Sequence, residues 1–189
     1  MIKQVTVAGF GGQGVMLLGQ TLAHAGNEVG LKTLWFPSYG PETRGGTANC
    51  GVTISNEQIN SPVYSKASTL IMLNEPSLRK FLDKVKDGGE VIYNSSLVTN
   101  EVKADKVRLY PIKANEIAME LGNIRVANMI MLGAYLALND EIPFDEIVKS
   151  LESIFGEGRK HLMEINIKAL KKGMECVTSK KEWKTLEIF

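Results

Sequence analysis

Several features that mark particular classes of protein are scarce in this chain of 189 residues. There are only two cysteines, Cys50 and Cys176, which lie far apart and form no C-x-x-C pair. A disulfide framework, a cysteine-bound metal and an iron–sulfur cluster are therefore not expected. Because two isolated thiols are typical of a reducing compartment, we expect a cytoplasmic protein.

Excess charge and long hydrophobic runs are also missing. The 22 basic and 21 acidic side chains give a net charge of +1, so neither nucleic acid nor an anionic membrane surface is an expected partner. The longest apolar stretch, residues 126–138, is shorter than the ~18 residues of a membrane span. The N-terminal MIKQVTVAGF has no long apolar region typical of a secretory signal.

Alternating strand and helix patterns fill the chain. Apolar, β-branched runs predict strands at 2–9, 32–36, 50–55, 67–73, 90–96 and 106–112, with a short return strand at 58–59. Helical spacing predicts helices at 14–30, 76–89, 115–122, 125–138, 143–155 and 161–177. The economical interpretation is one α/β domain over 1–189. We expect a three-layer, Rossmann-like fold with a largely parallel sheet and helices on both faces.

A glycine-rich turn, GFGGQG, follows the first predicted strand. Its G-x-G-x-x-G pattern permits a tight turn, a close backbone approach to a ligand, and close packing of helix on strand. The next helix begins here, and its exposed N–H groups favour an anion. The candidate binding residues are Gly9, Gly11, Gly12, Gln13 and Gly14. A closely packed corner without a ligand is the alternative interpretation.

The nicotinamide dinucleotide signature is incomplete. It also needs a carboxylate near the end of the second strand, to bind the ribose hydroxyl. That strand, KTLWF, carries no acid, and the nearest acids are Glu28 before it and Glu42 after it. The turn therefore fits a phosphate-bearing ligand or a subunit contact better than NAD.

A second polar and glycine-rich segment, SYGPETRGGTANC, spans residues 38–50. It offers hydroxyl and amide groups, bendable backbone, and in Arg44 a planar cation suited to phosphate or carboxylate. Because loops at the carboxyl ends of parallel strands share one edge of a sheet, we expect both segments to lie on a common surface. A plain polar surface loop is the alternative. The candidate binding residues are Ser38, Tyr39, Gly40, Arg44, Gly45, Gly46, Thr47 and Asn49.

These two motifs together resemble a known family. GFGGQGV, SYGPETRGGTANCGVTIS and the following IN-SP at 59–62 are similar to the gamma subunit of 2-oxoacid:ferredoxin (or acceptor) oxidoreductases. The resemblance extends to the late N-x-x-x-x-G-A pattern at 128–134. YGPETRGGTANC looks more like the 2-oxoglutarate or branched-chain 2-oxoacid type than the pyruvate type. Thr43 stands where Met or Arg is more usual, a small departure.

The resemblance implies a role within a larger enzyme. In that family the complex, a heterotetramer, decarboxylates a 2-oxoacid on thiamine diphosphate, passes electrons through iron–sulfur clusters to ferredoxin or another acceptor, and forms an acyl-CoA. The implied partners are alpha, beta and delta (ferredoxin-like) subunits, which hold thiamine diphosphate, magnesium and the clusters. For this chain the resemblance implies a structural, coenzyme A-facing role. It implies no catalytic residue, no metal, no cofactor held alone, and a possible homodimer when isolated.

Two alternatives remain open at this point. GFGGQG on a strand–helix–strand unit also fits a self-sufficient NAD(P)-dependent reductase. The indolepyruvate oxidoreductase partner subunit shares the same domain. His24 and His161 are expected to be packed or solvated rather than catalytic, and Asn128 to be a satisfied buried amide.

Overall fold

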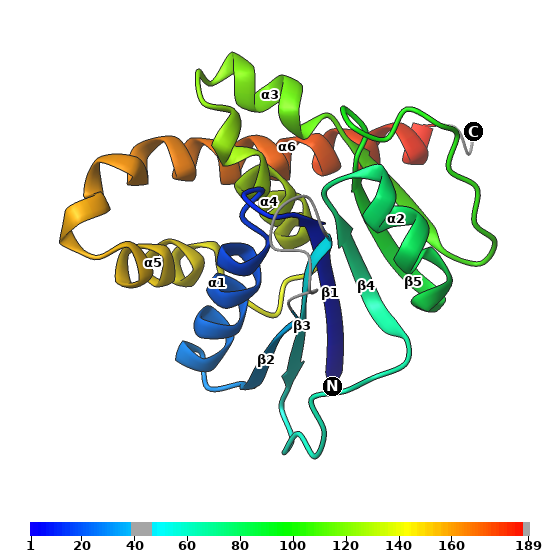
Figure 1. Ribbon diagram of the computed structural model, residues 1–189, viewed down its shortest axis with the longest axis horizontal. Coiled ribbons are helices and arrows are strands. Elements are labelled where there is room, and N and C mark those ends of the chain that lie inside the picture. The colour runs from blue at the N-terminus through cyan, green and yellow to red at the C-terminus, as the bar shows by residue number, and fades with distance from the viewer. Residues whose placement is uncertain (39–46, 187–189) are drawn as a thin grey trace.

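The computed structural model describes residues 1–38 and 47–186, with side chains up to residue 178 (Figure 1). The strands are β1 (Ile2–Phe10), β2 (Lys32–Ser38), β3 (Thr47–Ser55), β4 (Ala67–Met72), β5 (Val85–Asn94) and β6 (Arg108–Ile112). The α-helices are α1 (Val15–Glu28), α2 (Glu75–Phe81), α3 (Ala114–Glu120), α4 (Ala127–Leu138), α5 (Phe144–Phe155) and α6 (Met163–Leu186). Short 3-10 turns cover Leu82–Lys84, Ile124–Val126 and Glu157–Leu162.

All six strands form one sheet in the order β2-β3-β1-β4-β5-β6. β1, β4, β5 and β6 are parallel to one another, whereas β3 runs antiparallel to both β1 and β2. Consequently β2 runs in the same direction as β1, with β3 inserted between them. The expected three-layer α/β fold with a largely parallel sheet is confirmed. Sequence patterns could not place β3, because strand order follows from packing rather than from local propensity.

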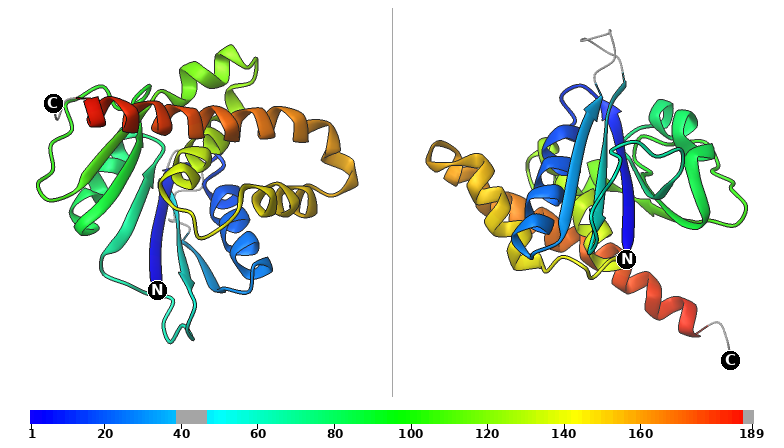
Figure 2. Two further views of the ribbon diagram at one scale, coloured as in Figure 1. Left: turned by 180° about the vertical axis from the view of Figure 1, so that it is seen from behind. Right: turned by 90° about the horizontal axis from the view of Figure 1, so that it is seen from below.

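One face of the sheet is fully covered by helices. Alternate side chains of β1 and β3, including Val7, Val52 and Ile54, are buried against Leu18 and Leu22 of α1. Helices α3 to α6 complete this layer, with α6 packed along α4. Figure 2 shows α1 and α5 on one side of the strands and α2 on the other. This face holds the larger of two hydrophobic cores.

The opposite face is covered over only part of its width. There α2 packs through Leu78 and Phe81 on Leu70 and Met72 of β4, which forms the smaller core. α2 also reaches β1 at Ala8, whereas no helix of the described residues covers β3 and β2 on this side. The irregular segment 60–66 crosses over them instead and contributes Tyr64. The incomplete cover leaves a bare portion of the sheet, described below.

Two predicted elements differ from the structure. The helix expected over 76–89 ends at Phe81, and residues 85–89 belong to β5. Gly88 has a positive φ of 75°, but it lies in a strand irregularity where its N–H donates to the Lys106 carbonyl, at 2.6 Å. A left-handed glycine therefore marked a distortion of a strand and not a helix end. Residues 58–59 form no strand.

Candidate functional site

The two predicted binding segments meet at one edge of the sheet. β1 and β2 end at this edge and β3 starts there, with Phe10 opposite Thr47 and Ser38 opposite Asn49. This placement confirms a shared edge for the described residues of both segments. Thr47, Asn49 and Ser38 belong to strands rather than to a loop, contrary to expectation. Five of the predicted residues lie outside the described part of the chain: Tyr39, Gly40, Arg44, Gly45 and Gly46.

The first glycine turn lies where a Rossmann-like sheet usually binds its ligand. β1 and β4 are adjacent and parallel, and the helices that follow them, α1 and α2, pack on opposite faces. The carboxyl ends of such a strand pair bound a crevice at the point where the winding direction changes. Residues 9–14 follow β1 at this point, and Leu73 with Asn74 follows β4.

The side chain of Gln13 links the segments that follow β1 and β4. Its Oε1 atom accepts a hydrogen bond from the Phe10 N–H, at 2.7 Å, and another from Asn74 Nδ2, at 2.9 Å. A Cβ atom on Gly9 would lie only 2.8 Å from Gln13 Oε1. Gly9 is therefore required by internal packing. The backbone donor that would meet a phosphate at Phe10 already has a partner.

Gly14 also has an internal reason to be glycine. Its φ is 76°, and a side chain there would overlap the amide of Asn128 on α4. Asn128 is buried and donates to the Gly14 carbonyl, at 3.2 Å, as expected for a satisfied amide. By contrast, Gly11 and Gly12 are exposed, and a Cβ at either would meet nothing within 4 Å. Gly11 therefore has no internal packing requirement.

Neutral amides continue along the same edge. Asn74 accepts from the Ser77 N–H at the start of α2, at 2.9 Å. Asn94, at the end of β5, donates to Asn115 of α3, at 2.9 Å. Asn74 and Asn94 are buried, and each has a hydrogen-bonding partner. Within its described residues β2 carries no acid, and its end is where a nicotinamide dinucleotide site places the carboxylate for the ribose.

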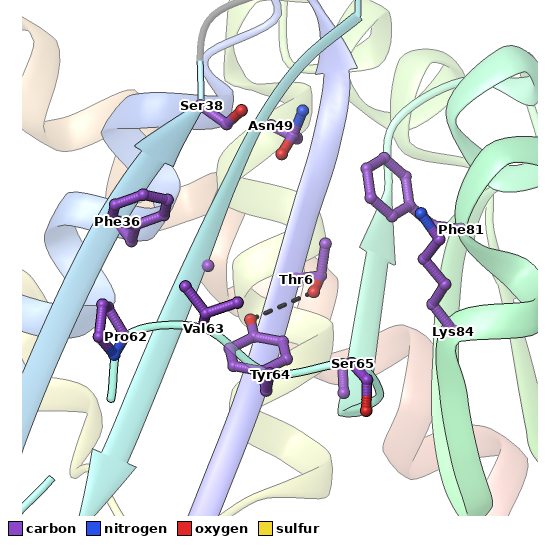
Figure 3. Close-up of a pocket in the computed structure, with 12 residues that line it drawn as sticks. Thr6, Phe36, Ser38, Asn49, Pro62, Val63, Tyr64, Ser65, Phe81 and Lys84 are labelled. Carbon is purple, nitrogen blue, oxygen red and sulfur yellow. Dashed lines mark hydrogen bonds between the residues drawn. The ribbon is translucent and has the colours of Figure 1, made fainter. Parts of the chain in front are cut away.

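A groove on the bare sheet face adjoins this edge (Figure 3). The strands form its floor, and the segment 62–65 crosses one end. Phe81 of α2 and the following Lys84 form a side wall. Its volume is about 220 Å³. Ser38 and Asn49 were candidates from the sequence, whereas the groove's other main residues were not. The residues that define it are Thr6, Phe36, Ser38, Asn49, Tyr64 and Lys84.

Tyr64 anchors the crossing segment to the sheet. Its hydroxyl donates to the Val5 carbonyl, at 2.7 Å, and lies 3.2 Å from Thr6 Oγ1. The ring lies over Gly51, where a Cβ would come within 2.9 Å of the phenol oxygen. Burial raises the pKa of Tyr64 to about 12, so the phenol is protonated at neutral pH. It serves as a fixed wall of the groove.

Two side chains of reactive types have structural surroundings. Burial raises the pKa of the Cys50 thiol to about 11, which makes it a poor nucleophile. His24 lies 3.0 Å from the Ser150 hydroxyl, so this ring has a structural partner. Within residues 1–38 and 47–178 no three His, Cys, Asp or Glu side chains gather as metal ligands. An iron–sulfur cluster held by this chain would not fit, since four thiolates are needed and the sequence has two.

No helix in the described part of the chain combines the length and the apolarity needed to span a lipid bilayer.

Comparison with protein families shows which family the chain belongs to. A family model described as pyruvate ferredoxin/flavodoxin oxidoreductase matches residues 4–176. The chain belongs to this oxidoreductase family. The sequence-based prediction of the family is therefore confirmed. The match includes the glycine turn, the crossing segment and most of α6.

Relatives in this oxidoreductase family fall into two size classes. The ketoisovalerate oxidoreductase subunit VorA of Methanothermobacter thermautotrophicus is 42% identical over 176 residues. That alignment covers 91% of this chain but only 36% of VorA, so the chain spans about a third of that relative. The 2-oxoglutarate synthase subunit KorC of Methanocaldococcus jannaschii is 34% identical, and the alignment covers 93% of this chain and 94% of KorC.

Solved structures show the same two classes. The gamma subunit of a keto/oxoacid ferredoxin oxidoreductase from Geobacter sulfurreducens matches with a TM-score of 0.80 and 28% identity, over 94% of this chain and 99% of that chain. A 2-oxoglutarate:ferredoxin oxidoreductase from Magnetococcus marinus, solved with 2-oxoglutarate, coenzyme A and succinyl-CoA bound, matches with a TM-score of 0.86 and 26% identity. The match covers 94% of this chain and 31% of the Magnetococcus marinus chain.

Proposed function

We propose that this chain is the gamma subunit of a multi-subunit 2-oxoacid:ferredoxin or acceptor oxidoreductase that converts 2-oxoglutarate to an acyl-CoA. One observation carries the proposal: the chain matches nearly the whole length of KorC and of a separately solved gamma subunit. A domain that corresponds to such a subunit is expected to take the same part in the enzyme.

The chain's role in this enzyme is to assemble and to face a ligand, while partner subunits carry out the chemistry. Its two cysteines are too few for a cluster, and Gln13 of the glycine turn is bonded to Phe10 and Asn74. Thiamine diphosphate, magnesium and iron–sulfur clusters would accordingly be held by alpha, beta and delta subunits. Electrons would leave the complex through those subunits to ferredoxin or another acceptor in the cytoplasm.

Coenzyme A would approach the shared edge formed by the two glycine-containing segments. Gly11 and Gly12 present backbone without side chains there, and Arg44 lies in the segment that joins Ser38 to Thr47. A guanidinium suits the phosphates of coenzyme A, because it donates in a planar fork. This part of the proposal depends on Arg44 more than on any other side chain.

Substitution Arg44→Ala in the assembled enzyme tests the coenzyme A contact. Loss of a charge-assisted contact costs about 1.5–3 kcal/mol, so the apparent KM for coenzyme A should rise by about 10- to 150-fold with little change in KM for the 2-oxoacid. Arg159→Ala, in the turn before α6, is the matched control. An unchanged response to coenzyme A in an intact complex would remove Arg44 from this role.

The complex itself is tested by purification of the tagged chain from its native cells. We expect alpha, beta and delta subunits to accompany it, and the complex to reduce ferredoxin or a viologen dye with a 2-oxoacid and coenzyme A. Recovery of the chain alone, together with tight binding of NAD(H) or NADP(H) in calorimetry, would instead favour a self-sufficient reductase.

A branched-chain 2-oxoacid is the second candidate substrate. The 42% identity with the ketoisovalerate subunit exceeds the 34% with KorC. The purified complex should be assayed with 2-oxoglutarate, 2-oxoisovalerate, pyruvate and indolepyruvate at equal concentrations. A kcat/KM for 2-oxoisovalerate above that for 2-oxoglutarate would replace the first candidate with the second, and a preference for indolepyruvate would assign the chain to that enzyme.

A further inference from the structure

The bare face of β1, β3 and β2 is incompletely covered for a sheet of this type. Sheets with mostly parallel strands are normally covered on both faces. Here the first face has α1, whereas among the described residues the second has the segment 60–66 and the flank of α2. Two large apolar side chains are consequently left in contact with solvent: Phe36 is 48% exposed and Val63 is 70% exposed.

The size of the groove on this face argues against a whole cofactor. Its volume of about 220 Å³ is below the ~300–1,000 Å³ that is usual for small-molecule sites. It matches one or two large side chains instead. Tyr64 is fixed by its two hydrogen-bonding partners, so this wall of the groove is preformed. Preformed pockets that accept one anchoring side chain are typical of the centres of protein interfaces.

The charge of the groove is of one sign. No Asp or Glu of the described chain lines it, whereas Lys84 does. Lys80 lies one helical turn earlier, and the two ammonium groups are 5.6 and 5.2 Å from the centre of the Phe81 ring. Neither lysine has a described carboxylate within ion-pairing distance. Lys80 does donate to the Thr47 hydroxyl, at 3.2 Å. Two cations without a described carboxylate partner, beside an apolar pocket, complement a segment with carboxylates next to an aromatic or aliphatic side chain.

Longer relatives indicate the kind of occupant. In VorA and in the Magnetococcus marinus enzyme the matched region makes up only 36% and 31% of the chain. The same domain is thus covalently joined to further polypeptide in those proteins. Further polypeptide of the same enzyme is therefore a suitable occupant for an uncovered face of this domain.

We propose that the groove bounded by Phe36, Tyr64 and Phe81 receives an acidic segment of a partner subunit, which inserts one large apolar side chain beside Lys80 and Lys84. This inference rests on the proposed function, because it assumes a multi-subunit enzyme. It adds a surface to that function: the bare sheet face, which adjoins the glycine-containing edge assigned to coenzyme A and shares Ser38 and Asn49 with it.

The first test identifies what lies in the groove of the native complex. A photoreactive benzoylphenylalanine replaces Phe36, the complex is irradiated, and the cross-linked peptide is sequenced. The expected product joins this chain to another subunit at a peptide that contains Asp or Glu beside an aromatic or large aliphatic residue. A product with a second copy of this chain, a peptide without acidic residues, or no product in an intact complex would overturn the proposal.

The second test measures the contribution of the two cations. The double variant Lys80→Glu/Lys84→Glu should weaken binding of this chain to the remaining subunits by about tenfold or more, since two exposed charge contacts become repulsive. Lys160→Glu, in the turn between α5 and α6, is the control and should change binding by less than about twofold. Circular dichroism must show that the double variant is folded. Equal binding of folded double variant and wild type would refute the charge complementarity.

The two hypotheses fail in different ways. If the wild-type chain is purified without other subunits, the proposed function is wrong, and the groove was never tested in a complex that exists. If the wild-type complex forms and the variant chains bind the other subunits as tightly as the wild-type chain does, only the groove proposal is wrong.

Discussion

The two faces of β1 and β3 are made by the same strands and yet serve different purposes. Towards α1, the side chains of Val7, Val52 and Ile54 are fully buried. Towards the opposite side, Thr6 and Gly51 form the floor of an open groove in which Phe36 is half exposed. Because successive side chains of a strand point to opposite faces, one short sequence encodes both a core and a surface. Burial on the α1 face stabilises the fold, whereas the open face remains available for contact with another molecule.

The largest effect should come from the covered face. Ile54→Ala removes a fully buried side chain beneath α1 and should reduce the free energy of unfolding by about 2–5 kcal/mol. Phe36→Ala, on the open face, should cost less than about 1 kcal/mol in the isolated chain. Denaturant unfolding of both variants measures the difference. Comparable losses would show that the open face is part of the core after all.

A smaller effect should separate two glycines of the same turn. Gly14→Ala places a side chain at a positive φ and against Asn128, and should destabilise the isolated chain by about 1–3 kcal/mol. Gly11→Ala meets open space without a left-handed φ and should change stability by less than about 0.5 kcal/mol. Thermal unfolding checks both. A large loss for Gly11→Ala would mean that this corner is constrained internally, not by a ligand or partner.

The smallest effect concerns Tyr64 and depends on pH. The pKa of this phenol is about 12 in the folded chain, against an ordinary value of 10.0 for an exposed tyrosine. Between these two pH values the folded state retains a proton that the unfolded state has lost. Stability must therefore fall as pH rises from about 10 to about 12. Tyr64→Phe should cost about 1 kcal/mol at neutral pH and reduce that fall by up to about 1.4 kcal/mol per pH unit. An unaltered pH slope in urea unfolding would contradict a buried phenol at this position.

The sequence was most informative where one local signal sufficed. Apolar runs and helical spacing predicted β1, α1, β2 and α4 near their observed positions. The glycine turn was recognised, and one of its two interpretations, a closely packed corner, holds for Gly9 and Gly14. Gln13 stays a candidate ligand-binding residue, and its Oε1 atom accepts hydrogen bonds from the Phe10 N–H and from Asn74. That contact joins positions 61 residues apart and leaves no local trace.

The remaining features depend on tertiary structure and were not readable from the sequence. Insertion of β3 between β1 and β2 brings Phe36 beside Gly51, and the crossing segment then adds Tyr64. Lys84 joins them from beyond α2. The strand at 85–89 was mistaken for helix because VKDGG lacks alternating apolar residues, and its Gly88 resembles a helix end. Strand pairing and a local irregularity override such weak propensities.

Hydrogen–deuterium exchange of the chain alone and in the native complex tests the central claim most directly. The account predicts slower exchange in the complex at residues 10–14, which form the glycine turn, and at 60–66, which cross the open face, with no change on α5. Protection confined to α5 and the start of α6, or no change at residues 10–14 and 60–66, would contradict an enzyme subunit that meets its partners through this edge and this face.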